Sequence, residues 1–509
     1  MTIGLLILLC AVSANAAGLS NAPARGELME LFVKVCDEAG YEFPLTTLPI
    51  TRLEIARHLD AMRELPMMRS RLRTDAGFRA RYQLLRRWLR DELAYLASGE
   101  DNGAVEAAAK LHRLYLEGRY LTQAGPTFDP WPRNDPRVWE MALGFSADAT
   151  VERHFSLTVE PQFTYRTRPK ARPPLENDDW IPAGELRRGY VMGAVGNVAV
   201  EIGRDDFWWG PGRFGNFLLT DNAGPLDHVR LGSRESFALP RVHPLFGTWR
   251  IQGLVAKLED DREFPNALLF GGRLTGQFLN VLELGVSRAI QAGGEGRSDL
   301  DLSDVGDIIV GRSEHEYADS DTNQLAQFDA RLSLGSLRGL WDRWLPLREV
   351  ELWGEMGADS VHNYFPSNQA LLWGGLLDFG VIDVTYEFAN TQAQSPWYEH
   401  YIYTDGYTFH DEIIGHEIGC CTRRHTGRVR LWTPWPARLE VRGDSADKRW
   451  RQIETEMTGV EGALIVLGDC FSLRASGGVW LLEQNNHIAG LPDESGAVSW
   501  GELSLAWRP

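Results

Sequence analysis

The sequence lacks long apolar runs, nucleotide-binding motifs and the usual signature of a catalytic nucleophile. Beyond its first 16 residues, no segment approaches the roughly 20 consecutive apolar residues that a membrane-spanning helix requires. It contains no G-x-S-x-G element, no P-loop and no dinucleotide fingerprint with a supporting helix. A propeller would show a repeat of about 40–50 residues, and none is visible. These absences give no sign of a cofactor, whereas a glycosidase pair among the many Asp and Glu stays open, because such a pair meets only in the fold.

Positive charge is also scarce in most of the chain. The 509 residues hold 52 Lys and Arg against 70 Asp and Glu, a formal net charge of −18. Residues 17–125 are nearly balanced, with 16 basic and 15 acidic residues, whereas the chain from residue 126 onward holds 36 and 55. An acidic surface repels phosphate backbones, so the balance argues against nucleic acid as a partner.

The first residues have the pattern of a secretory signal peptide. The apolar run IGLLILLCAV over residues 3–12 is followed by Ser13-Ala14-Asn15-Ala16, an A-x-A-like cleavage site. We expect cleavage before Ala17, which makes residues 1–16 the signal peptide and the mature protein an exported one. The start Met1-Thr2 lacks the usual Lys or Arg. A lipoprotein anchored at Cys10 is the weaker alternative, because large leucines precede it.

The segment 17–125 predicts a small helical bundle. Apolar residues recur at the spacing of one helix face over four stretches, which are Glu27–Gly40, Thr51–Arg63, Phe78–Leu96 and Val105–Leu121. Prolines crowd residues 126–136, where neither a helix nor a central strand can form. We interpret 126–136 as a linker between the bundle and the rest of the chain.

From Arg137 the apolar pattern changes to period two, as in Phe155, Leu157 and Val159. Long alternating runs separated by turn residues continue to the end, without interleaved helices. A single closed barrel over 137–509 would leave no exposed strand edge, and its length predicts about 16–20 antiparallel strands, with 18 as the best estimate. The 18 Trp and 14 Tyr suit aromatic girdles at a lipid interface. The trailing Arg508-Pro509 departs from the aromatic ending that many outer-membrane barrels have.

The most distinctive stretch runs from Arg204 to Leu231 and reads as a long loop leaving a strand. Gly210-Pro211-Gly212 forces a turn directly after a Trp pair. Flat rings beside guanidinium, carboxylate and amide groups suit a sugar, which stacks its C–H face on a ring and needs planar hydrogen-bonding partners. An interfacial anchor or a packed loop core is an equally good reading of the Trp pair. The candidate sugar-binding residues are Arg204, Trp208, Trp209, Arg213, Asp221, Asn222 and Asp227.

Two motifs in this half of the chain resemble a known family. The sequence F-W-W-G-P-G over Phe207–Gly212, followed by L-L-T-D-N-A-G-P over Leu218–Pro225, is similar to the capsule-assembly outer-membrane proteins of Gram-negative bacteria, the Wzi-like family. Gly406-Tyr407-Thr408-Phe409 and then Ile414-Gly415-His416 match a second piece in family order.

This resemblance implies a transmembrane β-barrel in the outer membrane, closed by its own loops, with the helical segment in the periplasm. It also implies a lectin-like role without catalysis, in which capsular or extracellular polysaccharide is bound and held at the cell surface. The expected partners are that polysaccharide, outer-membrane lipid and the polysaccharide export machinery. An acidic capsule would favour arginine as the contact, because a guanidinium can pair bidentately with a carboxylate.

Several alternatives stay open. A porin-like channel for oligosaccharides would use the same barrel, and a secreted polysaccharide-cleaving enzyme would use sandwich domains. His, Cys, Asp and Glu crowd residues 400–425, but their spacing matches no zinc motif, so we predict no metal. Cys470 could pair with Cys420 or Cys421 in an oxidising compartment.

Overall fold

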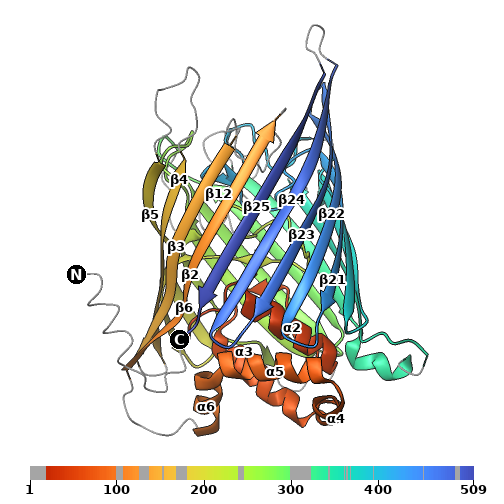
Figure 1. Cartoon of the computed structure of the whole chain (residues 1–509). Helices are drawn as coiled ribbons and strands as arrows, with labels where there is room; N and C mark the ends of the chain where they lie inside the picture. Colours follow the sequence, from red (N-terminus) through yellow and green to blue (C-terminus); the bar gives the residue numbers. More distant parts are fainter. Residues whose placement is uncertain are drawn as a thin grey trace.

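The computed structural model describes residues 19–98, 107–124, 137–151, 154–167, 180–238, 246–297, 322–341, 344–359, 361–362, 365–366, 368–393, 395–450, 452–487 and 493–509. These residues form a tall β-barrel with a group of helices at one end (Figure 1). The expected signal peptide, residues 1–16, and the Pro-rich segment 126–136 lie outside the described residues.

The barrel wall has 18 antiparallel strands, as the sequence predicted. Each strand bonds to the next along the chain, and pairing of the first strand with the last closes the wall. A short β9 (Phe237–Ala238) also pairs with β10. The strands are β2 (Ala107–Ala124), β3 (Arg137–Val151), β4 (Phe155–Thr167), β5 (Trp180–Val195), β6 (Val198–Asp205), β8 (Leu226–Ser233), β10 (Thr248–Lys257), β11 (Leu268–Phe278), β12 (Leu282–Ala292), β13 (Asn323–Ser333), β14 (Glu349–Asp359), β17 (Gln369–Asp378), β18 (Ile382–Asn390), β21 (Thr422–Trp432), β22 (Ala437–Trp450), β23 (Ile453–Leu467), β24 (Phe471–Asn486) and β25 (Glu494–Trp507).

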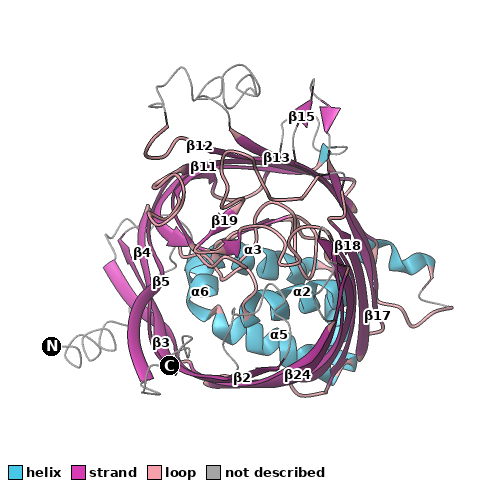
Figure 2. Cartoon of the chain, turned by 90° about the horizontal axis from the view of Figure 1, so that it is seen from above, coloured by secondary structure: helices cyan, strands magenta, loops and turns pink. Residues whose placement is uncertain are grey.

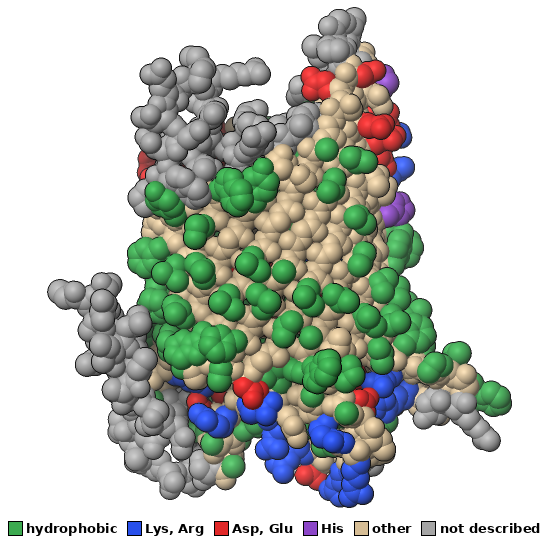
Figure 3. All heavy atoms as spheres, in the orientation of Figure 1, with side chains coloured by type: hydrophobic (Ala, Val, Ile, Leu, Met, Phe, Trp, Pro, Cys, Tyr) green, Lys and Arg blue, Asp and Glu red, His purple; other side chains and the backbone are tan. Residues whose placement is uncertain are grey.

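Alternation along each strand sorts side chains between the two faces of this wall. In β6, Val198 and Ile202 are exposed on the outside, whereas Glu201 between them is fully buried inside. Period two places such neighbours on opposite faces. Hydrophobic side chains consequently spread over the outer wall, while Lys and Arg gather on the helical end (Figure 3). An apolar outside and a polar inside are the pattern of a barrel that crosses a membrane.

The aromatic girdles match the expectation only in part. Trp373 and Trp435 are exposed on the outside. Trp353, Trp432 and Trp480 point inward instead and are at least 96% buried. The strand parity of these three residues directs their rings into the lumen, where they lie against polar side chains.

The helical segment begins as the sequence predicts. It comprises α2 (Glu27–Ala39), α3 (Arg52–Ala61), the 3₁₀ turn η1 (Met62–Glu64), α4 (Pro66–Thr74), α5 (Ala76–Trp88) and α6 (Arg90–Ser98). Gly40, with a φ of 62°, ends α2, and the Thr51 hydroxyl caps α3 by accepting from the Glu54 amide at 3.2 Å. The expected single helix over Phe78–Leu96 is two helices that meet at Leu89. No helix among the described residues is both long and apolar enough to cross a membrane.

The helix predicted over Val105–Leu121 is wrong, because this stretch forms β2, the first strand of the barrel. Its apolar residues fit both periods, and backbone pairing with β25 on one side and β3 on the other decides the outcome. The predicted boundary at 125 is therefore also wrong. Residues 126–136 connect two barrel strands and do not separate two domains.

Viewed along the barrel axis, the helices lie across the lumen and the loops fill one side above them (Figure 2). The remaining small sheets are β1 (Thr47–Leu48) with β7 (Trp208–Trp209), β15 (Val361–His362) with β16 (Phe365–Pro366), and β19 (Thr408–Phe409) with β20 (Glu412–Ile413). A second 3₁₀ turn, η2 (Gly335–Leu340), follows β13.

Buried ion pairs fasten the helices to the wall. Lys34 of α2 lies 2.7 Å from Asp378 of β17, whereas Arg81 of α5 lies 2.6 Å from Glu38 of α2 and joins these two helices to each other. Arg348, before β14, bonds to Glu38 at 3.0 Å. Buried charges are stable only when they are paired. The ion pairs therefore hold the helical segment in one position at this end of the barrel.

Candidate functional site

The Trp-Trp loop, residues 206–225, folds back into the lumen. Its first residues form β7, which pairs antiparallel with β1 of the helical segment, with Thr47 opposite Trp209 and Leu48 opposite Trp208. The loop, the helices and the barrel wall therefore meet at one place.

The two tryptophans have different surroundings. Trp209 is completely buried in the apolar cluster of the lumen loops, and its indole N–H donates to Gln252 Oε1 at 3.1 Å. Trp208 packs against the helical segment, and the guanidinium of Arg25 lies 4.9 Å from its ring centre. Trp209 is thus part of a packed loop core, which is one of the two interpretations that the sequence allowed. Of the two rings, only that of Trp208 borders a cavity.

The Gly-Pro-Gly turn brings the backbone close to barrel carboxylates. Gly210 has a φ of 132°, and a side chain at Gly212 would meet the Gly215 carbonyl oxygen at 1.9 Å, so both positions require glycine. The turn lets the Arg213 amide donate to Glu387 at 2.6 Å, while the Arg213 side chain bonds to Glu351 at 2.6 Å.

A second lumen loop, residues 391–421, packs directly on the first. The Tyr398 hydroxyl donates to the Phe217 carbonyl at 2.7 Å, and the Thr220 hydroxyl donates to the Gly415 carbonyl at 2.6 Å. A side chain at Gly415 would collide with the Phe217 carbonyl at 2.1 Å. Asn222 donates to the Ile413 carbonyl at 2.8 Å. The two motifs that lie about 190 residues apart in the sequence therefore form one structural unit.

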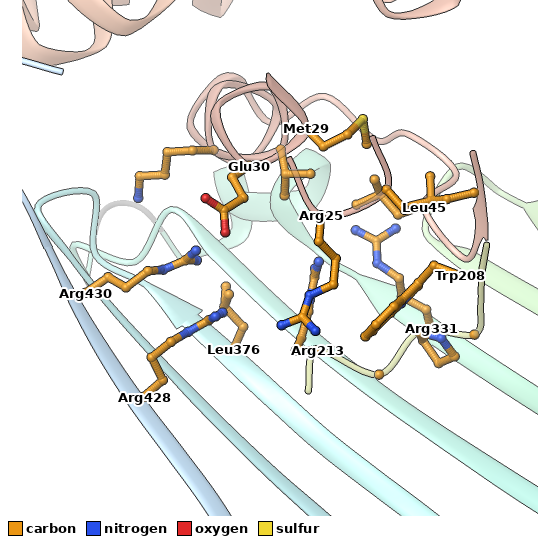
Figure 4. A pocket seen from close by; sticks show the side chains of 17 residues that line it. Arg25, Met29, Glu30, Leu45, Trp208, Arg213, Arg331, Leu376, Arg428 and Arg430 are labelled. Atoms are coloured by element: carbon orange, nitrogen blue, oxygen red, sulfur yellow. The ribbon is translucent and has the colours of Figure 1, made fainter. Parts of the chain in front are cut away.

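Arginines converge on a cavity of about 110 Å³ between α2, the Trp-Trp loop and the wall (Figure 4). Arg430 is paired with Asp383 at 2.6 Å. Arg428 is less well compensated, because its nearest carboxylate, Glu440, lies 3.9 Å away. Arg25 is 45% exposed and touches Asp221 at 3.5 Å. The cavity has room for one small anionic group and not for a sugar chain, since ligand pockets span roughly 300–1,000 Å³.

Two carboxylates of the lumen loops have pKa values that are shifted in opposite directions. Burial alone would raise the pKa of Glu417, but Arg424 and Arg442 lower it to about 2, so this side chain is a fixed anion. Burial raises the pKa of Asp206 to about 7, and the neighbouring carboxylates Asp205 and Asp221 act in the same direction, against Arg188.

Arg204 and Asp227 do not belong to this site. They pair with each other at 2.8 Å across β6 and β8, on the outward-facing parity of both strands. Asp227 is 58% exposed and stands in line with the apolar outer residues Val229 and Leu231. The sequence placed all the polar residues of the stretch in one loop, but its ends are strands whose alternation turns these two side chains away from the lumen.

Sequence reasoning also missed several residues of the cavity, including Arg25 and Arg428. Arg428 and Arg442 each lie 4.9 Å from the ring centre of Phe214, one on β21 and one on β22. The two strands are neighbours, and the Trp-Trp loop brings Phe214 to them from far away in the chain. The inward parity of the two arginines was the single available signal.

The cysteine and metal expectations can also be placed. The four described cysteines are free thiols. Cys470 lies in the turn between β23 and β24 at the helical end, whereas Cys420 and Cys421 precede β21 at the other end, so the pairing considered from the sequence does not occur. Within the described ranges, no three His, Cys, Asp or Glu side chains gather as metal ligands.

Comparison with known proteins gives concordant matches. Residues 139–459 match the family described as capsule assembly protein Wzi. A curated Klebsiella pneumoniae protein, described as an uncharacterised 55.8 kDa protein in the cps region, is 28% identical over 313 residues, which are 56% of this chain and 60% of that protein. The chain thus spans less than two thirds of this relative.

Among solved structures, Wzi of Escherichia coli is described as an outer-membrane protein involved in group 1 capsule assembly and a carbohydrate-binding β-barrel. It aligns with a TM-score of 0.64 at 19% identity, covering 95% of this chain and 99% of that one. At this identity the likeness establishes the fold. Pseudomonas aeruginosa OccK7 aligns with a TM-score of 0.46 at 10% identity, covering 79% and 98%, which is too distant to bear on function.

Proposed function

Because the chain belongs to the capsule assembly protein Wzi family, we propose that it is an outer-membrane protein that binds capsular or extracellular polysaccharide. It holds the polymer at the cell surface and catalyses no reaction. The observation that carries this proposal is the family match over 139–459, in a barrel whose lumen is occupied by the chain's own helices and loops.

The lengths of the connections support an orientation. At the helical end, six connections between strands span two to four residues, which are 152–154, 196–197, 279–281, 379–381, 433–436 and 468–470, and two are longer, 234–247 and 334–348. At the other end the connections include 206–225, 293–322 and 391–421. Barrels of the outer membrane have short periplasmic turns and long extracellular loops, so the helical end faces the periplasm. The apolar wall meets lipid, and the exposed helices face the export machinery.

A filled lumen favours binding over transport. Ion pairs seat the helical segment in the barrel mouth, and the two lumen loops interlock above it. A porin-like channel needs a continuous aqueous path, which these elements obstruct. Stepwise conductance of the purified protein in a planar bilayer would favour the channel instead.

The polymer contacts that we propose lie around the arginine-lined cavity. A single acidic side group of the polymer enters it, beside Trp208, while the chain runs along the loops above. Arg25, Arg213 and Arg428 line the cavity and provide the positive charge. Asp221 lies 3.5 Å from Arg25, and we include Asn222 as its neighbour in the same loop. Arg204, Asp227 and Trp209 are left out because two face outward and one is core.

Binding by the purified protein tests the proposal. The detergent-solubilised protein should retain labelled polysaccharide from its own strain, and Arg25→Gln should weaken this retention about tenfold, the value of one charge-assisted contact. Arg69→Gln, an exposed arginine on α4, is the matched control and should bind as the parent does. Absence of binding by the parent protein would sink the proposal.

A further inference from the structure

A second and larger cavity, of about 350 Å³, separates the helical segment from the barrel wall. It lies near β2, β5 and the end of β25, away from the Trp-Trp loop. Trp88, Lys110, Arg113, Arg188 and Arg508 are among its lining residues. Its volume is within the range of small-molecule sites, unlike that of the arginine-lined cavity.

Seven Lys and Arg side chains line this cavity, and three of them, Arg52, Arg113 and Arg188, have carboxylate partners that lie behind them. Arg113 bonds to Glu160 at 2.9 Å, and Arg52 bonds to Glu92 at 2.6 Å. Glu160 and Glu92 are at most 3% exposed and do not line the cavity. The three carboxylates that do line it are already engaged: Glu27 pairs with Arg508, Asp91 with Lys110 and Asp469 with Arg87.

Some buried polar atoms of the residues that line this cavity have no hydrogen-bond partner among the described residues. The side chain of Arg188 is 3% exposed and pairs with Asp205, yet its Nη2 has no hydrogen-bond partner among the described residues. Within the same part of the structure, Arg113 Nε and Asn21 Oδ1 also have none. Each of these three atoms is itself buried, so a ligand in the cavity would reach them only after a small shift of the side chains that line it.

Two β-bulges shape the wall here. The register between β2 and β3 shifts at Leu111/Arg113, which makes His112 the extra residue. The register between β4 and β5 shifts at Glu160/Pro161, opposite Arg188. A bulge re-aims neighbouring side chains, and consecutive residues 110–113 all reach the cavity as a result. In a regular strand only alternate residues would do so.

Positively charged side chains repel one another around Arg508, at the edge of this cavity. Burial lowers the pKa of Arg508, and repulsion by Arg113 and Arg52 lowers it further, against the attraction of Glu27. The Arg508 guanidinium lies 4.3 Å from the ring centre of Trp88. A bound anion would relieve this repulsion.

We propose that this cavity binds one acidic sugar unit, with its carboxylate on Arg113 and Arg188 and its hydroxyls on Asn21 and Ser146. The lining residues that belong to the barrel wall, such as Arg188, are directed to the inside of the barrel and not to its outer face, which argues against a lipid headgroup. The choice of a sugar rests on the proposed function, whereas the anion site rests on the cavity alone.

Titration of the detergent-solubilised protein with glucuronate tests this proposal, with glucose and inorganic phosphate as comparators. We expect saturable binding of glucuronate, at least tenfold weaker binding of glucose, and about a tenfold loss in Arg113→Gln. Arg119→Gln, on the same strand but outside the cavity, is the control. Lys110→Gln replaces Arg113→Gln if the latter fails to migrate as a folded barrel on an unboiled gel.

Equal binding of glucose and glucuronate would overturn the proposal, and so would unchanged binding in both variants or binding of phosphate without glucuronate. Retention of polysaccharide by whole cells reports the proposed function separately. Loss of glucuronate binding with retention intact, or the reverse, therefore distinguishes the two failures.

Discussion

The ammonium group of Lys34 on α2 lies 2.7 Å from the Asp378 carboxylate on β17, and both side chains are at most 2% exposed. The residues are 344 positions apart, and the pair joins the helical segment to the barrel wall. A second wall carboxylate, Asp383, lies 3.8 Å from the same nitrogen. This arrangement makes the helices a fixed plug, on which the lumen loop then rests through β1 and β7.

Replacing Lys34 by methionine should destabilise the folded protein by about 3–5 kcal/mol, because it leaves the buried Asp378 without its cation. Urea unfolding of the purified barrel, followed by tryptophan fluorescence, measures the loss. Arg69→Met removes an exposed pair with Glu64 and should change stability by less than about 1 kcal/mol. An equal loss of unfolding free energy in the two variants would show that the Lys34–Asp378 pair does not hold the helices in the barrel.

The Trp pair should separate into a core residue and a cavity residue. Trp209→Ala removes a fully buried ring and its bond to Gln252, which should cost about 3–5 kcal/mol and reduce the folded, heat-modifiable form. Trp209→Phe keeps most of the packing and should recover most of that form. A Trp209→Ala barrel as stable as the parent would show that the loop does not pack in the lumen.

Two arginines of the same stretch should behave differently. Arg213→Gln loses its bonds to the buried Glu351 and should lower polysaccharide binding about tenfold or more. Arg204→Gln breaks an exposed pair on the outer wall and should leave binding unchanged. Binding assays on the two purified variants decide this, and a loss in Arg204→Gln alone would place the site elsewhere.

The sequence predicted the larger features because strand alternation is local. The barrel, its 18 strands and the first two helices follow from periodicity and from capping residues such as Gly40 and Thr51. The stretch 105–121 was mistaken for a helix because its apolar residues satisfy both periods, and only pairing with β25 and β3 selects the strand.

The candidate site was predicted less completely, for a different reason. Loop composition identified Trp208 and Arg213, but it grouped Arg204 and Asp227 with them although strand parity turns those outward. Arg25 belongs to the N-terminal helical segment, and Arg428 reaches the site because the Trp-Trp loop lies against β21. Their contacts depend on chain folding over hundreds of residues, which no local pattern encodes.

The stability of the lumen loop should depend on pH through Asp206. Its folded pKa of about 7 lies above its ordinary value near 3.8, so the folded state holds the proton more tightly over that window. The stabilising contribution is complete below about pH 3.8 and is lost as the pH rises towards 7. Asp206→Asn should remove this slope, so that its melting temperature exceeds that of the parent by more at pH 8 than at pH 4. A constant difference would contradict the raised pKa.

The central claim is that this barrel holds polysaccharide on the cell, and its most direct measurement compares cell-bound with released polysaccharide. Strains that lack the gene, carry it, or carry Arg213→Gln are washed, and the polymer in the pellet and in the medium is quantified. The account predicts that deletion moves polymer into the medium without reducing the total, and that Arg213→Gln does so in part. Unchanged attachment in the deletion strain, with the parent protein present in the outer membrane, would contradict it.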